Sequence, residues 1–272
     1  MLVSRNHRTR RQLLAGHRLG SIVTAFALIA TGTAFAPSAS AADKIKISKA
    51  TFAREVTSDF KAKGEATDFY GNETVYLLLK IKGRPKEGVI GGHWMFRGSE
   101  IGKASVDLAS INKGVFFSFG QDSFVKFNFT PAKANPLPVG SSYAVVIDVN
   151  GVTAGKYPFT VIPPKGALPS KLVKATLSDA KGGALKTTFA MTDTVYLNIT
   201  ADLGLATWLE ATWMVSGKED PNGTRNLSLK ENKPAVDGHF SFAPAGGWPK
   251  GAHSVVLVMN DKQVGVYKFT VS

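Results

Sequence analysis

The chain has 272 residues, which allows one large domain or two of ordinary size. It contains no cysteine, which excludes disulfides, a thiolate nucleophile and a cysteine metal site. Of its 33 basic residues, five are arginines in the first 41 positions, where no acidic residue occurs, so 28 basic residues face 20 acidic ones in the remainder. This modest surplus suits an anionic partner such as an envelope polymer or a lipid headgroup, although an ordinary basic surface is the simpler interpretation. We do not expect nucleic acid to be the partner.

The first 41 residues have the layout of a cleavable secretory signal. Arginines precede an apolar run over 22–35, and an Ala-x-Ala site ends at Ala41. The stretch TRRQLLA resembles the twin-arginine export signal, and general secretion fits as well. The apolar run is shorter than the ~20 residues of a membrane span. We therefore expect cleavage after Ala41 and a periplasmic or secreted product without a membrane span, with retention as an uncleaved anchor as the alternative.

Four short blocks recur in the same order in the rest of the chain, which is the signature of a tandem duplication. The paired blocks are ETVYLLLKI with DTVYLNITA, HWMFRG with TWMVSG, VKFNFTP with GHFSFAP, and AGKYPFTV with VGVYKFTV. Between the two copies lies IPPKGALPS, in which three prolines fix the backbone and predict a short, stiff connector.

Each copy shows the period of two that is typical of β-strands. In the stretch 75–82, for example, the residues Val75, Leu77, Leu79 and Ile81 fall on one face. Turn signals such as Asn150-Gly151 and Asn222-Gly223 separate such runs at intervals of roughly ten residues. No long window has a clean helical period. Seven or eight short strands in a unit of this size predict a β-sandwich.

The end of the first copy has a Pro-Gly turn before a tyrosine, then alternating valines, an Asn-Gly turn and a closing Phe-x-Val strand. The residues concerned are Pro138, Gly140, Tyr143, Asn150, Gly151, Phe159 and Val161. This pattern resembles the last hairpin of bacterial immunoglobulin-like and fibronectin type III-like domains. The resemblance implies that Tyr143 is a corner tyrosine whose hydroxyl bonds upstream backbone. In the second copy His253 stands where this tyrosine would be.

The fold that we predict is therefore all-β, with two tandem immunoglobulin-like β-sandwich domains after a signal peptide. The expected segments are the signal peptide at 1–41, domain 1 at 42–162, a Pro-rich linker at 163–170 and domain 2 at 171–272. Such domains serve as adhesion modules, carbohydrate-binding accessories, chaperones and spacers, so the resemblance does not define a function.

The repeated tryptophans, Trp94 and Trp213, are predicted to be core residues together with Tyr143. Alternation places each tryptophan on the same face as an apolar residue two positions later, and duplication of an inward pair is what maintenance of a fold requires. Ligand stacking is the alternative interpretation. Trp248, beside a Pro-Gly turn, could cover the end of the sandwich or stack on a sugar ring.

The candidate binding residues are basic. Lys80, Lys82, Arg84 and Lys86 occupy alternate positions, so in an extended segment they would project from one face like a comb. The second copy has Thr200 and Asp202 at the positions of Lys80 and Lys82, so the fold does not require the charges. Lysines that discourage edge pairing are the simpler interpretation.

Two further binding candidates, His93 and Arg97, flank the first repeated tryptophan. The second copy replaces them with Thr212 and Ser216, whereas the inward residues are kept in kind. Histidine spacing predicts no metal site, and no cofactor motif occurs. The S-x-x-K at 58–61 lacks the partner motifs of penicillin-recognising enzymes, so we interpret it as a coincidence.

These observations predict an exported, non-enzymatic protein of the cell envelope that binds an anionic component or a protein partner, or that has a structural role. One alternative is a periplasmic chaperone, which would require an unpaired edge strand that accepts a client strand. The other is an enzyme or accessory module that acts on envelope polysaccharide, which would require a cleft with converging carboxylates or histidines. The sequence leaves the oligomeric state open.

Overall fold

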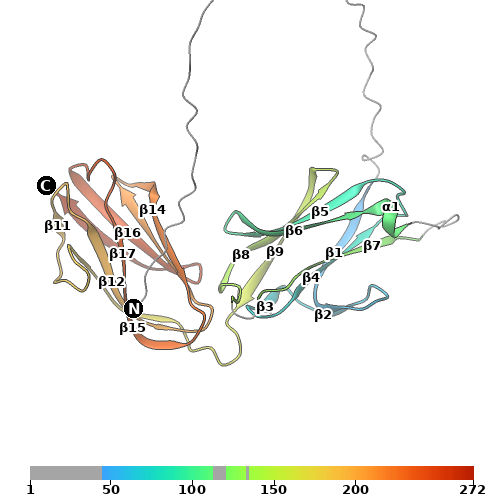
Figure 1. Cartoon of the computed structure of the whole chain (residues 1–272), viewed down its shortest axis with the longest axis horizontal. Coiled ribbons are helices and arrows are strands. Elements are labelled where there is room, and N and C mark those ends of the chain that lie inside the picture. Colours follow the sequence, from blue (N-terminus) through green and yellow to red (C-terminus); the bar gives the residue numbers. More distant parts are fainter. Residues whose placement is uncertain (1–44, 113–120, 133–134) are drawn as a thin grey trace, which may run out of the picture.

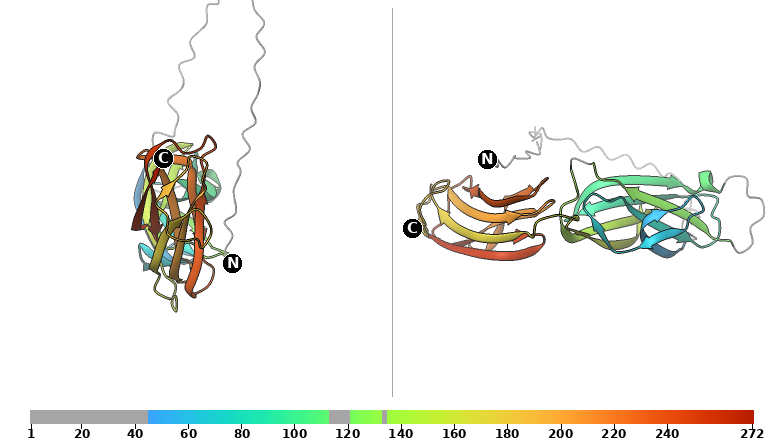
Figure 2. Two further views of the ribbon diagram at one scale, coloured as in Figure 1. Left: turned by 90° about the vertical axis from the view of Figure 1, so that its left-hand side faces the viewer. Right: turned by 90° about the horizontal axis from the view of Figure 1, so that it is seen from below.

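The structure, a computed structural model, describes residues 45–112, 121–132 and 135–272. It is all-β apart from one short helix, and it contains two β-sandwiches that lie side by side along the longest axis of the molecule (Figures 1 and 2). Each sandwich encloses a hydrophobic core of its own. No helix among the described residues is long and apolar enough to cross a membrane.

The first sandwich, called unit 1 below, consists of a four-stranded and a five-stranded sheet with the orders β2-β1-β4-β7 and β3-β9-β8-β5-β6. Its elements are β1 (Ile47–Val56), β2 (Ala62–Glu65), β3 (Asp68–Tyr70), β4 (Val75–Ile81), β5 (Val89–Phe96), β6 (Ser99–Asp107), α1 (Leu108–Ile111), β7 (Ser123–Phe129), β8 (Gly140–Val149) and β9 (Val152–Ile162).

The second sandwich, unit 2, repeats this arrangement without a counterpart of β2. Its sheets have the orders β10-β12-β15 and β11-β17-β16-β13-β14. The strands are β10 (Lys171–Ser178), β11 (Thr188–Phe189), β12 (Val195–Leu203), β13 (Trp208–Val215), β14 (Lys218–Ser228), β15 (Lys233–Phe242), β16 (Gly251–Met259) and β17 (Lys262–Val271). Because β9 ends at Ile162 and β10 begins at Lys171, the proline-rich stretch connects the two units.

On β4, alternate residues face the core between the two sheets of unit 1. The side chains of Val75, Leu77 and Leu79 are fully buried, which is the face that the period of two predicts. Trp94 on β5 and Trp213 on β13 are 1% and 0% exposed, each in the core of its own unit. The repeated Trp-Met stretches therefore supply scaffold.

In both units a side chain near the start of the second-last strand bonds the backbone of the turn that precedes that strand. The side chain is a tyrosine in unit 1 and a histidine in unit 2. In unit 1 the hydroxyl of Tyr143 donates to the carbonyl of Pro138 at 2.6 Å, which is the corner bond that the resemblance implies. In unit 2 the buried ring of His253 takes this place, with Nε2 at 2.8 Å from the carbonyl of Pro249 and Nδ1 at 3.2 Å from the backbone nitrogen of Ser216. A neutral imidazole with its proton on Nε2 satisfies both bonds.

Trp248 lies inside unit 2 and is fully buried. Its indole nitrogen donates to the carbonyl of Asp193 at 2.8 Å, and its ring packs edge-on against Phe242 and Phe269. Of the two interpretations of Trp248, covering the end of the sandwich is correct and stacking on a sugar is wrong, because no face of the ring is accessible.

The two units contact each other directly as well as through the connector. The backbone nitrogen of Val139 donates to the carbonyl of Ala206 at 2.8 Å. Phe96 of unit 1 meets Trp208 of unit 2 edge-on, with ring centroids 5.2 Å apart. These contacts join the end of one sandwich to the end of the other.

Candidate functional site

The predicted comb does not form, because the strand that would extend it ends early. β4 ends at Ile81, and Gly83 follows with a φ of +69°, in the left-handed region that favours glycine. The backbone nitrogen of Gly83 donates to Asp122 at 3.0 Å, and the same carboxylate lies 2.9 Å from the ammonium of Lys80. The chain therefore turns away from the sheet at the centre of the expected comb.

The four basic side chains consequently have different surroundings. Lys80 pairs with Asp122, which lowers the pKa of that carboxyl through the bond from the lysine. Arg84 bonds the side chain of Gln121. Lys82 and Lys86 are exposed. Lys80 and Lys82 both lie near Asp122, and the binding role of the four basic residues stays a prediction.

His93 is held between two carboxylates on the outer face of the five-stranded sheet of unit 1. Its Nδ1 lies 2.7 Å from Glu100 on β6, and its Nε2 lies 2.9 Å from Asp148 on β8. The bonds to Glu100 and then to Asp148 raise the pKa of His93, so these carboxylates favour the imidazolium. Gly91 makes room for this arrangement, because a Cβ there would lie 2.0 Å from the carboxylate of Asp148. We call these three side chains the histidine clamp.

The histidine clamp uses both ring nitrogens internally. Within the described ranges, no group of His, Cys, Asp and Glu side chains has an arrangement that could hold a metal ion. His93 therefore has no ring nitrogen left to offer a ligand while the clamp is closed.

Arg97 contacts the other unit. Its guanidinium lies 2.5 Å from Glu210 and 2.5 Å from Asp261, both in unit 2, whose side chains are only 12% and 11% exposed. Burial raises the pKa of Glu210 despite the opposing effect of Arg97. The prediction that Arg97 binds a ligand needs correction, because its guanidinium forms ion pairs with two carboxylates of unit 2.

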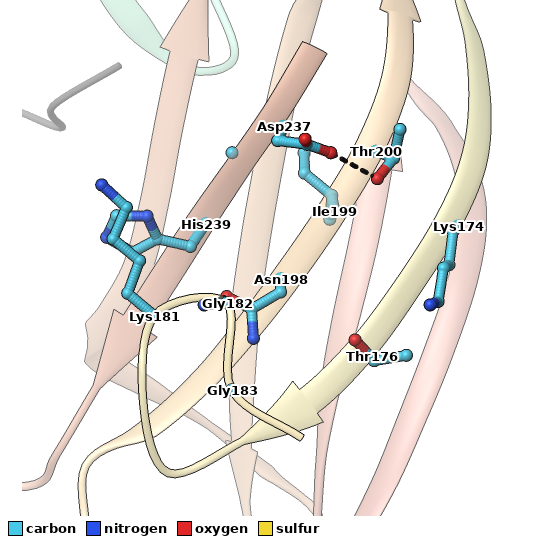
Figure 3. Close-up of a pocket in the computed structure, with 11 residues that line it drawn as sticks. Lys174, Thr176, Lys181, Gly182, Gly183, Asn198, Ile199, Thr200, Asp237 and His239 are labelled. Carbon is cyan, nitrogen blue, oxygen red and sulfur yellow. Dashed lines mark hydrogen bonds between the residues drawn. The ribbon is translucent and has the colours of Figure 1, made fainter. Parts of the chain in front are cut away.

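A groove that sequence reasoning missed lies on the outer face of the three-stranded sheet of unit 2 (Figure 3). Its volume is about 320 Å³. Strand pairing sets two rows of polar side chains across β10, β12 and β15. The rows are Lys174, Thr200 and Asp237, and next to it Thr176, Asn198 and His239.

The wall of the groove is the loop 179–187, which Asn198 holds over the sheet. The side-chain oxygen of Asn198 accepts from the backbone nitrogen of Gly182 at 2.8 Å, and its nitrogen donates to Ser178 at 2.6 Å. Outside the groove, Lys186 pairs with Asp179 at 2.8 Å and with Asp193 at 3.0 Å, which fixes the loop to the unit. The loop brings the side chain of Lys181 to the groove (Figure 3).

The floor of the groove offers both hydrogen-bond donors and acceptors. Thr200 donates to Asp237 at 2.6 Å, which leaves the second oxygen of the carboxylate to accept. Burial and then the nearby Lys181 lower the pKa of His239, so its imidazole is neutral at pH 7 and can donate through one nitrogen and accept through the other. Neither Lys174 nor Lys181 forms an ion pair with a carboxylate in the described part of the chain.

The equivalent face of unit 1 has an apolar cluster in place of the groove floor around Asn198. The strand pairing of unit 1 places Leu78 at the position of Asn198 and Lys126 at that of His239. There Leu78 packs with Ala53 and Val56 in a small buried cluster beside the β1–β2 hairpin. The groove is thus a feature of unit 2 that the duplicated fold does not require.

Comparison with known proteins supplies no family. No protein-family model matches the chain, and no curated protein matches it. Among solved structures, the transglutaminase of red sea bream is similar, with 9% identity and a TM-score of 0.26. The alignment covers 84% of this chain and 31% of the transglutaminase, so the chain spans less than a third of that protein's length. A likeness of this size carries no argument about activity.

Proposed function

We propose that the protein is an exported, non-enzymatic binding protein of the cell envelope, composed of two immunoglobulin-like domains that act as one body. Export rests on the signal-like first 41 residues. The immunoglobulin-like assignment is supported by the strand orders, in which β3 and β11 pair in parallel with the last strands of their units, and by the Tyr143 corner.

The single observation that carries the binding role is the open polar groove of unit 2. On the equivalent face of unit 1, Leu78 packs with Ala53 and Val56, and Phe124 packs against this cluster. In unit 2 the positions of Leu78 and Phe124 hold Asn198 and Asp237, which line a cavity of about 320 Å³. A concave site with a few converging polar groups is the usual form of a ligand site.

The chemistry of the groove supports binding rather than hydrolysis. Glycoside hydrolysis uses two carboxyl groups on opposite sides of the bond that breaks. The lining of this groove contains one carboxylate, that of Asp237, which already accepts a bond from Thr200. The remaining groups bind and orient a ligand, and they include no second carboxylate in the position of a nucleophile or base.

The experiment is retention of components from an envelope extract on the immobilised mature protein, from Ala42 onward. The double variant Asp237→Ala, His239→Ala removes two polar groups from the groove floor, and we expect it to lose most of the specifically retained material. The control Glu87→Ala, Thr153→Ala removes two exposed polar side chains of unit 1 and should retain as much as the wild type. Equal retention by all three proteins, at equal thermal stability, contradicts the proposed function.

A further inference from the structure

The groove of unit 2 has a positive charge on each side. Lys174 projects from β10 and Lys181 from the loop 179–187, and Figure 3 shows them on opposite sides of the polar floor. Neither has a carboxylate partner among the described residues. Two separated ammonium groups suit a ligand with spaced negative charges, because each lysine acts as a point charge.

Between the two lysines, the side chains on the floor of the groove can form hydrogen bonds with the hydroxyl groups of a ligand. His239 can donate and accept, the free oxygen of Asp237 can accept, and the hydroxyl of Thr176 can do either. Sugar hydroxyls also donate and accept, so they can satisfy all three groups at once. The imidazole of His239 adds a ring surface, and the ring lies 5.8 Å from that of Tyr196.

The carboxylate of Asp237 favours one class of anionic ligand, the carboxylates, over phosphates. A phosphate group is bound by Arg forks, by backbone N–H groups and also by lysines, so the two lysines by themselves suit either a phosphate or a carboxylate. Asp237 in the lining would repel a phosphate dianion more strongly than a carboxylate with a single charge. A carboxylate carries one diffuse charge and can approach a lysine while the neighbouring hydroxyls of the same sugar meet Asp237.

On these grounds, and resting on the proposed function, we propose that the groove of unit 2 binds an acidic saccharide, in which sugar hydroxyls contact Thr176, Asp237 and His239 while carboxylates pair with Lys174 and Lys181. A chain of such sugars would lie across β10, β12 and β15, from one lysine to the other.

Titration calorimetry with the mature protein tests this assignment. The probes are trigalacturonic acid, triguluronic acid and a hyaluronan hexasaccharide, each compared with its methyl ester, which keeps the hydroxyls and removes the charge. We expect at least one acid to bind about tenfold more tightly than its ester, because each lost charge-assisted bond lowers affinity by about that factor. Binding should weaken as salt is raised.

Matched variants separate the site from general charge. Lys174→Ala, Lys181→Ala should weaken binding of the acid by at least about tenfold and bring it to the level of the ester. Lys103→Ala, Lys156→Ala removes the same charge from exposed positions of unit 1 and should leave binding unchanged. Thermal unfolding and circular dichroism of both variants should match those of the wild type if the fold is intact.

Three results would overturn the assignment: no acid binds, acid and ester bind equally, or both lysine variants lose binding alike. Competition by inorganic phosphate at the same concentration as the saccharide would also reject it and favour a phosphate ligand. If envelope material is retained through the groove while every acidic saccharide fails, this inference falls and the proposed function stands. If groove variants do not change retention, the proposed function itself falls.

Discussion

The guanidinium of Arg97 in unit 1 lies 2.5 Å from the carboxylate of Asp261 in unit 2. The same carboxylate accepts from the backbone nitrogens of Ser141 and Ser142 at 2.7 and 2.9 Å. The carboxylate of Asp261 can approach this closely because residue 140 is a glycine. A Cβ at that position would lie only 2.6 Å from the carboxylate. One side chain of unit 2 therefore satisfies three donors of unit 1. We call this contact the interdomain lock.

The interdomain lock has arisen at a turn that both copies contain. Unit 1 has Asn150-Gly151 there, with φ values of +52° and +80°, whereas unit 2 has Asn260-Asp261, with +51° and +63°. Glycine adopts this conformation without strain and aspartate does so at a cost. The strained residue is the one that contacts the neighbouring unit, which is where stored strain is expected to serve a purpose.

Replacement Asp261→Gly should therefore loosen the contact between the two units without unfolding either one, while the Arg97–Glu210 ion pair and the contact of Phe96 with Trp208 remain. Glycine fits the positive φ, and the three donors of unit 1 lose their acceptor. Because the chain contains no cysteine, single cysteines at the exposed positions 103 and 218 can carry spin labels, and the distance distribution between them should broaden. The control Lys262→Ala changes the adjacent exposed residue and should keep the narrow distribution. An unchanged distribution in Asp261→Gly contradicts a lock at this contact.

The histidine clamp predicts a specific dependence of stability on pH. The pKa of His93 is raised in the folded state, so its stabilising effect is fully present below the ordinary value of 6.5 and is lost as the pH rises through the folded value. The ring is 35% exposed, so we expect at most about 1 kcal/mol after screening by water. Urea unfolding of wild type and His93→Gln should differ more at pH 5.5 than at pH 9. A difference that is the same at both pH values would refute the clamp.

Gly91→Ala should break the bond between His93 and Asp148 in the histidine clamp. The added Cβ would lie 2.0 Å from the carboxylate of Asp148 and would push it away from His93. We expect a destabilisation of about 1–2 kcal/mol, which includes some overpacking. In the His93→Gln variant, Gly91→Ala should lower the free energy of unfolding by a smaller amount. The effects of two substitutions that remove the same interaction are not additive. Gly246→Ala, with open space around the new methyl group, is the control and should have little effect.

The contribution of the corner bond of unit 1 to stability can be measured by removing one hydroxyl group, that of Tyr143. Tyr143 is 1% exposed, and burial raises the pKa of its hydroxyl, so the group stays protonated and donates to Pro138. Tyr143→Phe leaves the carbonyl of Pro138 without this donor and should cost about 1–2 kcal/mol. Tyr157→Phe removes a hydroxyl for which no such bond is seen in the described structure, and it should cost less than about 0.5 kcal/mol. Equal costs for the two variants would argue against the corner bond.

The duplicated pattern made the scaffold predictable. Alternation alone places Trp94 and Trp213 inward, because side chains of a strand alternate between its two faces. The comb failed for a local reason, since Gly83 adopts a positive φ and ends the regular strand before Arg84. The role of Arg97 could not be read from the sequence, because its partner Asp261 is 164 residues away in the other copy.

The groove could have been found only with the strand register. Thr176, Asn198 and His239 lie on three strands, and each is an ordinary outward residue of its own strand. The sequence shows Thr200 at the position of Lys80, which indicates only that the fold does not require the charge there. Strand pairing shows that Thr200 lies beside Asn198 and Asp237, the two positions of this face at which unit 2 has a polar residue and unit 1 an apolar one.

The most direct test of the groove as the binding site is to locate bound ligand by the amide chemical shifts of the isotope-labelled mature protein. On addition of the retained envelope component, we predict that the shifted amides cluster on β10, β12, β15 and the loop 179–187, around Thr176, Asn198 and His239. Unit 1 should change little. Shifts that cluster on the outer face of unit 1, or no shifts at saturating ligand, would contradict the assignment of the groove as the binding site.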